Sequence, residues 1–242
     1  MFSYLYDNYS KNEILWMSFI IFFISIIPVF LFTTLDLLQL KYLEKYRINY
    51  GHGRKYPPKK EIIHSSKYIL RNLICFIVPI FILIFILCNI FNISPFIISR
   101  TLPTLDICII HLVGILLLSE ILLYMLHRIM HDQDLYNTIH KTHHKYTETF
   151  ALVNYYMHPL ELFLFMSMIF IPPILFHSHI AIFWISIIII NWNGIIIHSG
   201  YNFTETSLLR IKEHDIHHKY FNYNYGVMFT FMDYLCNTYY RK

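Results

Sequence analysis

Long uncharged, apolar runs alternate with short polar segments along this chain. A membrane-spanning helix needs about 20 apolar residues. Runs of sufficient length lie at 14–35, 72–99, 107–126 and 162–204. The last run is long enough to cross twice, and Pro172 and Pro173 near its middle predict a helical hairpin that turns there. The pattern therefore predicts an all-α integral membrane bundle of about four or five spans.

Composition agrees with a membrane protein. The chain is 56% hydrophobic and only 14% charged, which is too apolar for an ordinary soluble domain. Ile14 to Leu35 is 22 uncharged residues without a signal-peptide cleavage site, so we expect a retained anchor. Because no repeat or low-complexity linker divides the sequence, we expect one membrane domain over residues 1–242.

The basic residues predict how the bundle is oriented. Nine Lys or Arg lie between Lys41 and Arg71, against two acidic residues. Such a block also occurs in proteins that bind nucleic acid, but between apolar spans it indicates a cytoplasmic loop, and we expect no nucleic-acid partner. With this loop in the cytosol, 17 of the 19 Lys and Arg are cytosolic, all except Lys11 and Arg100. The third span and the hairpin then both end on the cytosolic face.

Histidines gather just beyond the predicted spans. Nine of the fifteen occur as HRIMH at 127–131, HKTHH at 140–144, His198, and HDIHH at 214–218. Helical residues three or four apart share a face, so each box is expected to direct its imidazoles toward one point. The sequence therefore predicts a cytosolic cap in which the histidines hold metal.

The number of histidines predicts two metal ions. A four-coordinate ion uses four ligands, and eight or nine imidazoles exceed that number. Neutral imidazole suits iron, copper, zinc and nickel alike, so the ligand type leaves the metal open. Five further histidines lie outside the boxes, and we expect them to be hydrogen-bonded structural residues: His52, His64, His111, His177 and His179.

The three boxes, in this order, resemble the membrane fatty acid hydroxylase and sterol desaturase superfamily. The resemblance covers about residues 119–240. Within the superfamily the sequence between the boxes is most similar to the 4-methylsterol oxidases, or methylsterol monooxygenases. The phrases that carry this are YMLHRIMH at 124–131, LYNTIHKTHH at 135–144, HPLE at 158–161, HSGY at 198–201, NYG at 224–226 and MDY at 232–234.

This resemblance implies an activity and its cofactors. It implies two iron ions that activate O2, with electrons from NAD(P)H delivered through cytochrome b5 and its reductase. The substrate it implies is a sterol, or another lipid, that reaches the site from the bilayer and is oxidised at a methyl group on carbon 4. It also implies a multi-pass protein of the endoplasmic reticulum membrane whose histidine boxes face the cytosol. In such an enzyme the cofactor performs the oxidation and the protein binds and orients the substrate.

The resemblance also assigns residues. As metal ligands it implies His127, His131, His140, His143, His144, His198, His214, His217 and His218. His158 is a weaker candidate. Glu120 lies two helical turns before His127, where it either orients a ligand imidazole through the second ring nitrogen or simply ends the apolar span. Asn193 stands where the family has an acidic residue, and its amide is a weaker partner for a histidine. The sequence singles out no catalytic residue beyond the metal centre and no substrate-binding residue.

Three other functions remain open from the sequence. The histidine boxes are shared across the superfamily, so a sterol C-5 desaturase or a fatty acid or lipid hydroxylase is the nearest alternative. A non-catalytic membrane metal-binding protein or transporter is a different class, which the scarcity of ionisable residues within the spans disfavours. The third is a homologue that keeps the boxes without turnover.

Overall fold

The computed structural model of the chain describes residues 11–48, 56–91, 95–203 and 210–240, and within them every regular element is a helix. The long helices are α1 (Lys11–Leu38), α2 (Lys59–Asn72), α3 (Val78–Ile90), α4 (Leu105–Met130), α6 (Pro159–Leu175) and α7 (Ile180–His198). The short elements are η2 (Lys41–Tyr46), η3 (Leu73–Ile77), α5 (Gln133–Thr138), η4 (His140–Lys145), η5 (Ala151–Tyr155), α8 (Ile211–Tyr220) and α9 (Phe231–Leu235). The all-α prediction is confirmed.

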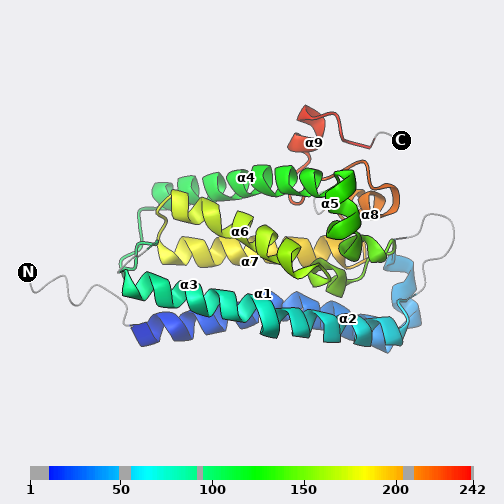
Figure 1. Cartoon of the computed structure of the whole chain (residues 1–242), viewed down its shortest axis with the longest axis horizontal. Helices are drawn as coiled ribbons and strands as arrows, with labels where there is room; N and C mark the ends of the chain where they lie inside the picture. The colour runs from blue at the N-terminus through cyan, green and yellow to red at the C-terminus, as the bar shows by residue number, and fades with distance from the viewer. Residues whose placement is uncertain (1–10, 49–55, 92–94, 204–209, 241–242) are drawn as a thin grey trace, which may run out of the picture.

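The long helices lie alongside one another, and the short elements α5, α8 and α9 gather at one end of them (Figure 1). Among the described residues, four helices are long and apolar enough to cross a membrane: Trp16–Leu38, Lys59–Leu83, Leu105–Met130 and Ile180–His198. α6 is a shorter apolar helix of 17 residues. The outer faces of α1 and α3 expose large apolar side chains such as Phe19, Phe30 and Ile82, as expected for surfaces that lipid covers.

The second span differs from its predicted position. It was expected at 72–99, but the helix begins at Lys59 and continues through the π-helical segment η3 to Ile90. Pro79 explains the π-helical turns, because it has no N–H and its ring clashes with the carbonyl four residues before it. The second half of the basic segment 41–71 is therefore helix and not loop. Residues 49–55 of that segment, including His52, lie outside the described residues.

α2 is amphipathic, which explains how a charged segment enters the fold. Its buried residues are Ile62, Ser65, Ile69 and Asn72, which recur at helical spacing, while its lysines remain on the outer face. Ile62 and Ile69 pack against Phe150 and Leu152 at the start of η5. The side chain of Asn72 donates to the carbonyl of Met157 at 2.9 Å.

The predicted hairpin is confirmed and lies between α6 and α7. Pro172 and Pro173 fall in the last turns of α6, and the chain reverses over Phe176–His179. The side chain of His179 accepts a hydrogen bond from the backbone N–H of Ala181 and so caps α7. α6 packs against α4 and α7 packs against α1, which brings the C-terminal ends of α4 and α7 to the same end of the bundle.

Candidate metal centre

The nine predicted histidines meet at one end of the bundle. His127 is in the last turn of α4 and His131 caps that helix, while His198 is the last residue of α7. The other six lie on the short elements beyond the spans: His140, His143 and His144 on η4, and His214, His217 and His218 on α8. They form two groups, and within each group the ligand nitrogens lie within 4.8 Å of one another.

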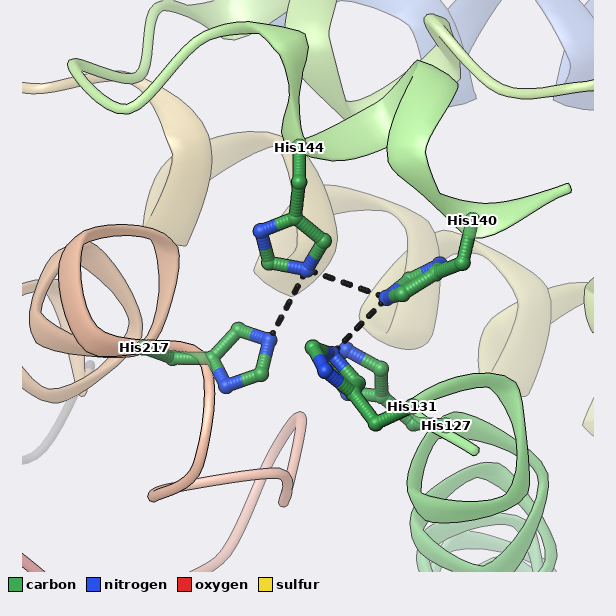
Figure 2. Close-up of side chains that lie close together, drawn as sticks. All are labelled: His127, His131, His140, His144 and His217. Carbon is green, nitrogen blue, oxygen red and sulfur yellow. Dashed lines mark hydrogen bonds between the residues drawn. The ribbon is translucent and has the colours of Figure 1, made fainter. Parts of the chain in front are cut away.

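The first group contains five histidines, drawn in Figure 2: His127, His131, His140, His144 and His217. Their Nε2 atoms converge on one point. The Nε2 of His140 is 2.9 Å from that of His131 and 3.0 Å from that of His144, and the Nε2 of His144 is 3.2 Å from that of His217. Such spacing lets several imidazoles contribute a lone pair to a single ion.

The second group contains His143, His198, His214 and His218. The Nε2 of His198 lies 3.3 Å from that of His143 and 2.8 Å from that of His214. The two groups are neighbours, since the ring centroids of His144 and His218 are 4.5 Å apart. Two sets of converging nitrogens side by side match the donor set expected for two metal ions.

Each HxxHH box serves both groups, so the expectation that a box points toward one spot is wrong. In HKTHH, His140 and His144 belong to the first group and His143 to the second. In HDIHH, His217 belongs to the first group and His218 to the second. The reason is geometric, because consecutive helical residues do not face the same direction. An adjacent pair of histidines therefore reaches two ions.

Backbone carbonyls hold the outer nitrogens of four histidines. The Nδ1 atoms donate as follows: His127 to Tyr225 O at 2.8 Å, His217 to Tyr223 O at 2.7 Å, His198 to Gly194 O at 2.7 Å, and His218 to Tyr146 O at 3.2 Å. A carbonyl oxygen only accepts, so each of these Nδ1 atoms carries the proton and each Nε2 keeps its lone pair. This tautomer and ring orientation are what a metal ligand requires.

Burial keeps the imidazoles neutral. His131 is half-buried, and the other eight are almost fully buried. On η4 and α8, burial is the first cause that lowers the pKa of the six histidines well below its ordinary value, with repulsion among neighbouring imidazoles adding to it. The pKa of His131 is lowered for the same reasons. Neutral imidazole is the form that binds metal.

Unpartnered lone pairs test whether metal fits these groups. The Nε2 of His127 in the first group and of His218 in the second are buried without a hydrogen-bond partner in the described part of the chain. A buried polar atom without a partner is costly, and a cation between the converging Nε2 atoms satisfies it. The residues present therefore fit two imidazole-ligated ions.

Glu161 has a contact that the sequence reasoning did not assign. Its buried carboxylate Oε1 lies 2.5 Å from the Nδ1 of His140. It is in the first turn of α6, and a single acidic residue at the start of an apolar helix was the signal available in the sequence. This carboxylate–histidine contact is the role that one interpretation gave to Glu120.

Glu120 instead binds backbone. It is fully buried, and its two carboxylate oxygens accept from the N–H groups of Val227 at 3.0 Å and Met228 at 2.7 Å. From the other side, Asp233 accepts from the N–H groups of Tyr225 at 2.8 Å and Gly226 at 3.0 Å. The two carboxylates fix the segment 223–228, whose carbonyls hold His127 and His217.

The remaining candidates lie outside both groups. His158 caps α6 by accepting from the N–H of Leu160 at 3.3 Å. The amide of Asn193 donates to the carbonyl of Val227 at 3.0 Å, so its hydrogen bond goes to the fixed segment 223–228. Neither group includes the other histidines expected to be structural: His64, His111, His177 and His179.

An apolar cavity of about 90 Å³ borders the metal groups. Histidines from both groups line it: His127, His143, His198 and His214. Most of its wall comes from apolar side chains of α4, α6 and α7, among them Leu123, Leu162, Phe165 and Ile190. The converging histidine nitrogens therefore border an apolar space directly.

These features define a helical membrane protein with a buried, two-group histidine centre, and the comparisons give its family. Residues 112–238, slightly more than half of the chain, match the fatty acid hydroxylase family, and the chain belongs to that family. Methylsterol monooxygenase 1 of Danio rerio is 29% identical over 98% of this chain and 81% of its own length.

Two further relatives carry other names. The human fatty acid hydroxylase domain-containing protein 2 is 29% identical over 77% of this chain and 55% of its own length. The Delta(7)-sterol 5(6)-desaturase of Candida dubliniensis is 31% identical over 52% of this chain and 33% of its own length. No solved structure matches the chain.

Proposed function

We propose that this protein is a membrane-bound di-iron oxidoreductase that uses O2 to oxidise a methyl group on carbon 4 of a sterol. The observation that carries the proposal is the pair of adjacent groups of neutral, buried imidazoles that face an apolar cavity. Similarity to a methylsterol monooxygenase over nearly the whole chain supports the choice of substrate.

The two histidine groups divide the metal binding between them. His127, His131, His140, His144 and His217 hold one ion, and His143, His198, His214 and His218 hold the other. Two iron ions held there would supply the activation of O2 that an unactivated C–H bond requires. The carbonyls of Tyr223 and Tyr225 and the carboxylate of Glu161 keep the imidazoles oriented, so little reorganisation accompanies metal binding.

The cavity provides the place for the reacting carbon. Its apolar wall excludes water and favours hydrocarbon, and the histidines at its border set the distance between substrate and metal. An apolar cavity of roughly 150 Å³ holds one benzene ring. At about 90 Å³ this cavity is smaller than that, so it takes in only the ring edge that carries the reacting methyl group, with the rest of the sterol extending toward the bilayer.

The cellular setting belongs to the same proposal. Electrons come from NAD(P)H through cytochrome b5 and its reductase, and the protein resides in the endoplasmic reticulum membrane with the metal centre at the cytosolic face. The distribution of Lys and Arg supports this orientation.

A desaturase is the second candidate. The Candida dubliniensis relative named a sterol desaturase matches 52% of this chain, which supports a shared metal centre with a different outcome. The two functions differ in product, because hydroxylation inserts oxygen at the methyl group whereas desaturation creates a ring C=C bond.

Metal content tests the centre first. Protein purified in detergent after expression with iron is expected to hold about two irons per chain, since two ligand groups are present. His217→Ala, in the first group, and His143→Ala, in the second, are each expected to lose about one iron, and the double variant both. His158→Asn, which keeps a side-chain cap and lies outside both groups, serves as the control and is expected to keep the full content.

Product analysis tests the reaction. Iron-loaded protein, NADPH, cytochrome b5, its reductase and a 4,4-dimethylsterol are expected to yield the 4-hydroxymethyl sterol and its more oxidised products by mass spectrometry. Well-folded protein without stoichiometric metal would contradict the oxygenase centre. A ring C=C bond in place of an oxidised methyl group would establish the desaturase. Iron-loaded protein that does not convert the sterol would show that a 4-methylsterol is not the substrate.

A further inference from the structure

Three polar side chains interrupt the apolar wall of the cavity, apart from the histidines. They are Asn154 and Tyr155, on η5, and Asn191, on α7. They lie together, because the hydroxyl of Tyr155 donates to Oδ1 of Asn191 at 2.5 Å. In a lipid-binding cavity a few polar atoms fix the orientation of the ligand, so their free hydrogen-bonding capacity determines what they recognise.

Two of the three have their hydrogen bonds satisfied within the protein. The amide of Asn191 donates to the carbonyl of Ser25 at 2.8 Å, and its oxygen accepts from Tyr155. The side chain of Asn154 is close enough to the hydroxyl of Tyr155 to affect its pKa. The single hydroxyl proton of Tyr155 goes to Asn191, so toward that hydroxyl Asn154 can act only as a donor, through Nδ2. The Oδ1 of Asn154 is the acceptor that remains.

Gly194 shows where this oxygen lies. A Cβ added at Gly194 would be 2.7 Å from Oδ1 of Asn154, so the oxygen lies directly against the bare backbone of α7. Both residues line the cavity. The carbonyl of the same Gly194 accepts from Nδ1 of His198, which belongs to the second metal group. Four residues of helix span about 6 Å, so the acceptor is about one turn of α7 from a metal ligand.

We infer that Oδ1 of Asn154 accepts a hydrogen bond from a hydroxyl group of the substrate, close to the carbon that is oxidised. The substrate class is a lipid with a hydrocarbon body and a hydroxyl a few bonds from the reacting methyl group. The missing side chain of Gly194 leaves the space beside α7 in which this oxygen lies, and both residues belong to the cavity lining. This inference rests on the proposed function and adds the residue that selects the substrate.

The polarity of the contact gives a test that needs no variant. Zinc replaces iron in protein held in lipid nanodiscs, so that the protein binds a sterol without oxidising it. The affinity is then measured for three 4,4-dimethylsterols, which carry a 3-hydroxyl, a 3-ketone or no oxygen at carbon 3. The Oδ1 acceptor can form a hydrogen bond only with a donor on the ligand, and the hydroxysterol alone has one at carbon 3. The hydroxysterol is therefore expected to bind about tenfold tighter than the other two sterols. Equal binding of the hydroxysterol and the ketone overturns the inference.

Variants assign the preference to Asn154. In Asn154→Leu, which has similar size and no acceptor, the ratio of the hydroxysterol and deoxysterol affinities is expected to fall to about one. In Asn154→Asp, which keeps an oxygen at the same place, the preference for the hydroxysterol persists. Met166→Leu, an apolar change in the same wall, is the control and is expected to keep the ratio of the unaltered protein. An unchanged ratio in Asn154→Leu overturns the assignment.

Failures of the two proposals give different results. If the iron-loaded enzyme oxidises the hydroxysterol but the zinc-loaded protein binds all three sterols equally, only the inference about Asn154 is wrong. If the protein holds two irons but binds none of the three sterols, the sterol assignment falls and the inference falls with it.

Discussion

Adjacent histidines separate into different groups, and this split is what lets two short boxes bind two ions. His143 and His144 are neighbours in sequence, yet each belongs to a different group, and the same holds for His217 and His218. The number of histidines was sufficient to predict two ions. Their division was not predicted, because each box was treated as one helical face, whereas adjacent histidines point in different directions on η4 and on α8 alike.

Substitution of Glu161 tests whether its contact with His140 supports metal binding by the first group. Removing the carboxylate in Glu161→Ala is expected to lower the affinity of the first group for metal about 10- to 100-fold, because His140 loses the partner of its Nδ1. Glu161→Gln keeps an acceptor and is expected to lose less. Competitive metal titration with a chelator measures both. Glu148→Gln, at an exposed acidic residue, is the control. Equal metal affinity in Glu161→Ala and the unaltered protein would show that the contact is dispensable.

Among the elements, the segment 223–228 has no regular structure, but two of its carbonyls orient His127 and His217 of the first group. Gly226 lets it pass between its neighbours, since an added Cβ would lie 2.5 Å from the carbonyl oxygen of Phe229 and 2.8 Å from Oε1 of Glu120. In Gly226→Ala the backbone has to shift, which displaces the carbonyls that hold His127 and His217. The expected result is a loss of about 1–3 kcal/mol of stability together with loss of iron from the first group.

Gly114→Ala provides the matched comparison for Gly226→Ala. It lies on the same helix as His127, but its added Cβ would meet the ring of Phe176 at 2.5 Å, far along α4 from the histidines. Thermal unfolding and iron content are measured for both. We expect Gly114→Ala to lower stability while keeping about two irons per chain. Retention of both irons in Gly226→Ala would contradict the role given to the segment.

The elements also show what the sequence could predict. The all-helical class, the hairpin and the set of nine histidines followed from apolar run length, paired prolines and residue spacing. The early start of the second span was missed because α2 carries lysines on its outer face, and a search for uncharged runs excludes such a helix. Glu161, which had no expected role, makes the histidine contact that one interpretation gave to Glu120, because a contact between residues 21 or more positions apart depends on packing that spacing along one helix does not reveal.

At the scale of the molecule, the N-terminal half holds the metal-binding half in place. Arg47 forms a buried ion pair with Asp36 at 2.7 Å, and the hydroxyl of Tyr201 donates to the same carboxylate at 2.9 Å. Tyr201 follows His198 by three residues, and the N–H of Ile48 bonds to the carbonyl of Gly200 at 3.1 Å. The family match begins only at residue 112, yet these contacts make α1 part of the support for α7.

Metal removal tests the whole assembly, because the ligands come from elements up to 91 positions apart in sequence, from His127 to His218. Ligands bound to the folded state stabilise it, by about 2.7 kcal/mol for each ion present at 100 times its Kd. Chelation of both irons from purified protein is therefore expected to lower the midpoint of thermal unfolding by roughly 10–20 °C. The His143→Ala, His217→Ala double variant, which lacks the ions, is expected to show no shift with chelator. An unchanged midpoint in the chelated wild-type protein would mean that packing alone holds the nine imidazoles together, and that the ions add no cross-link between α4, η4, α7 and α8.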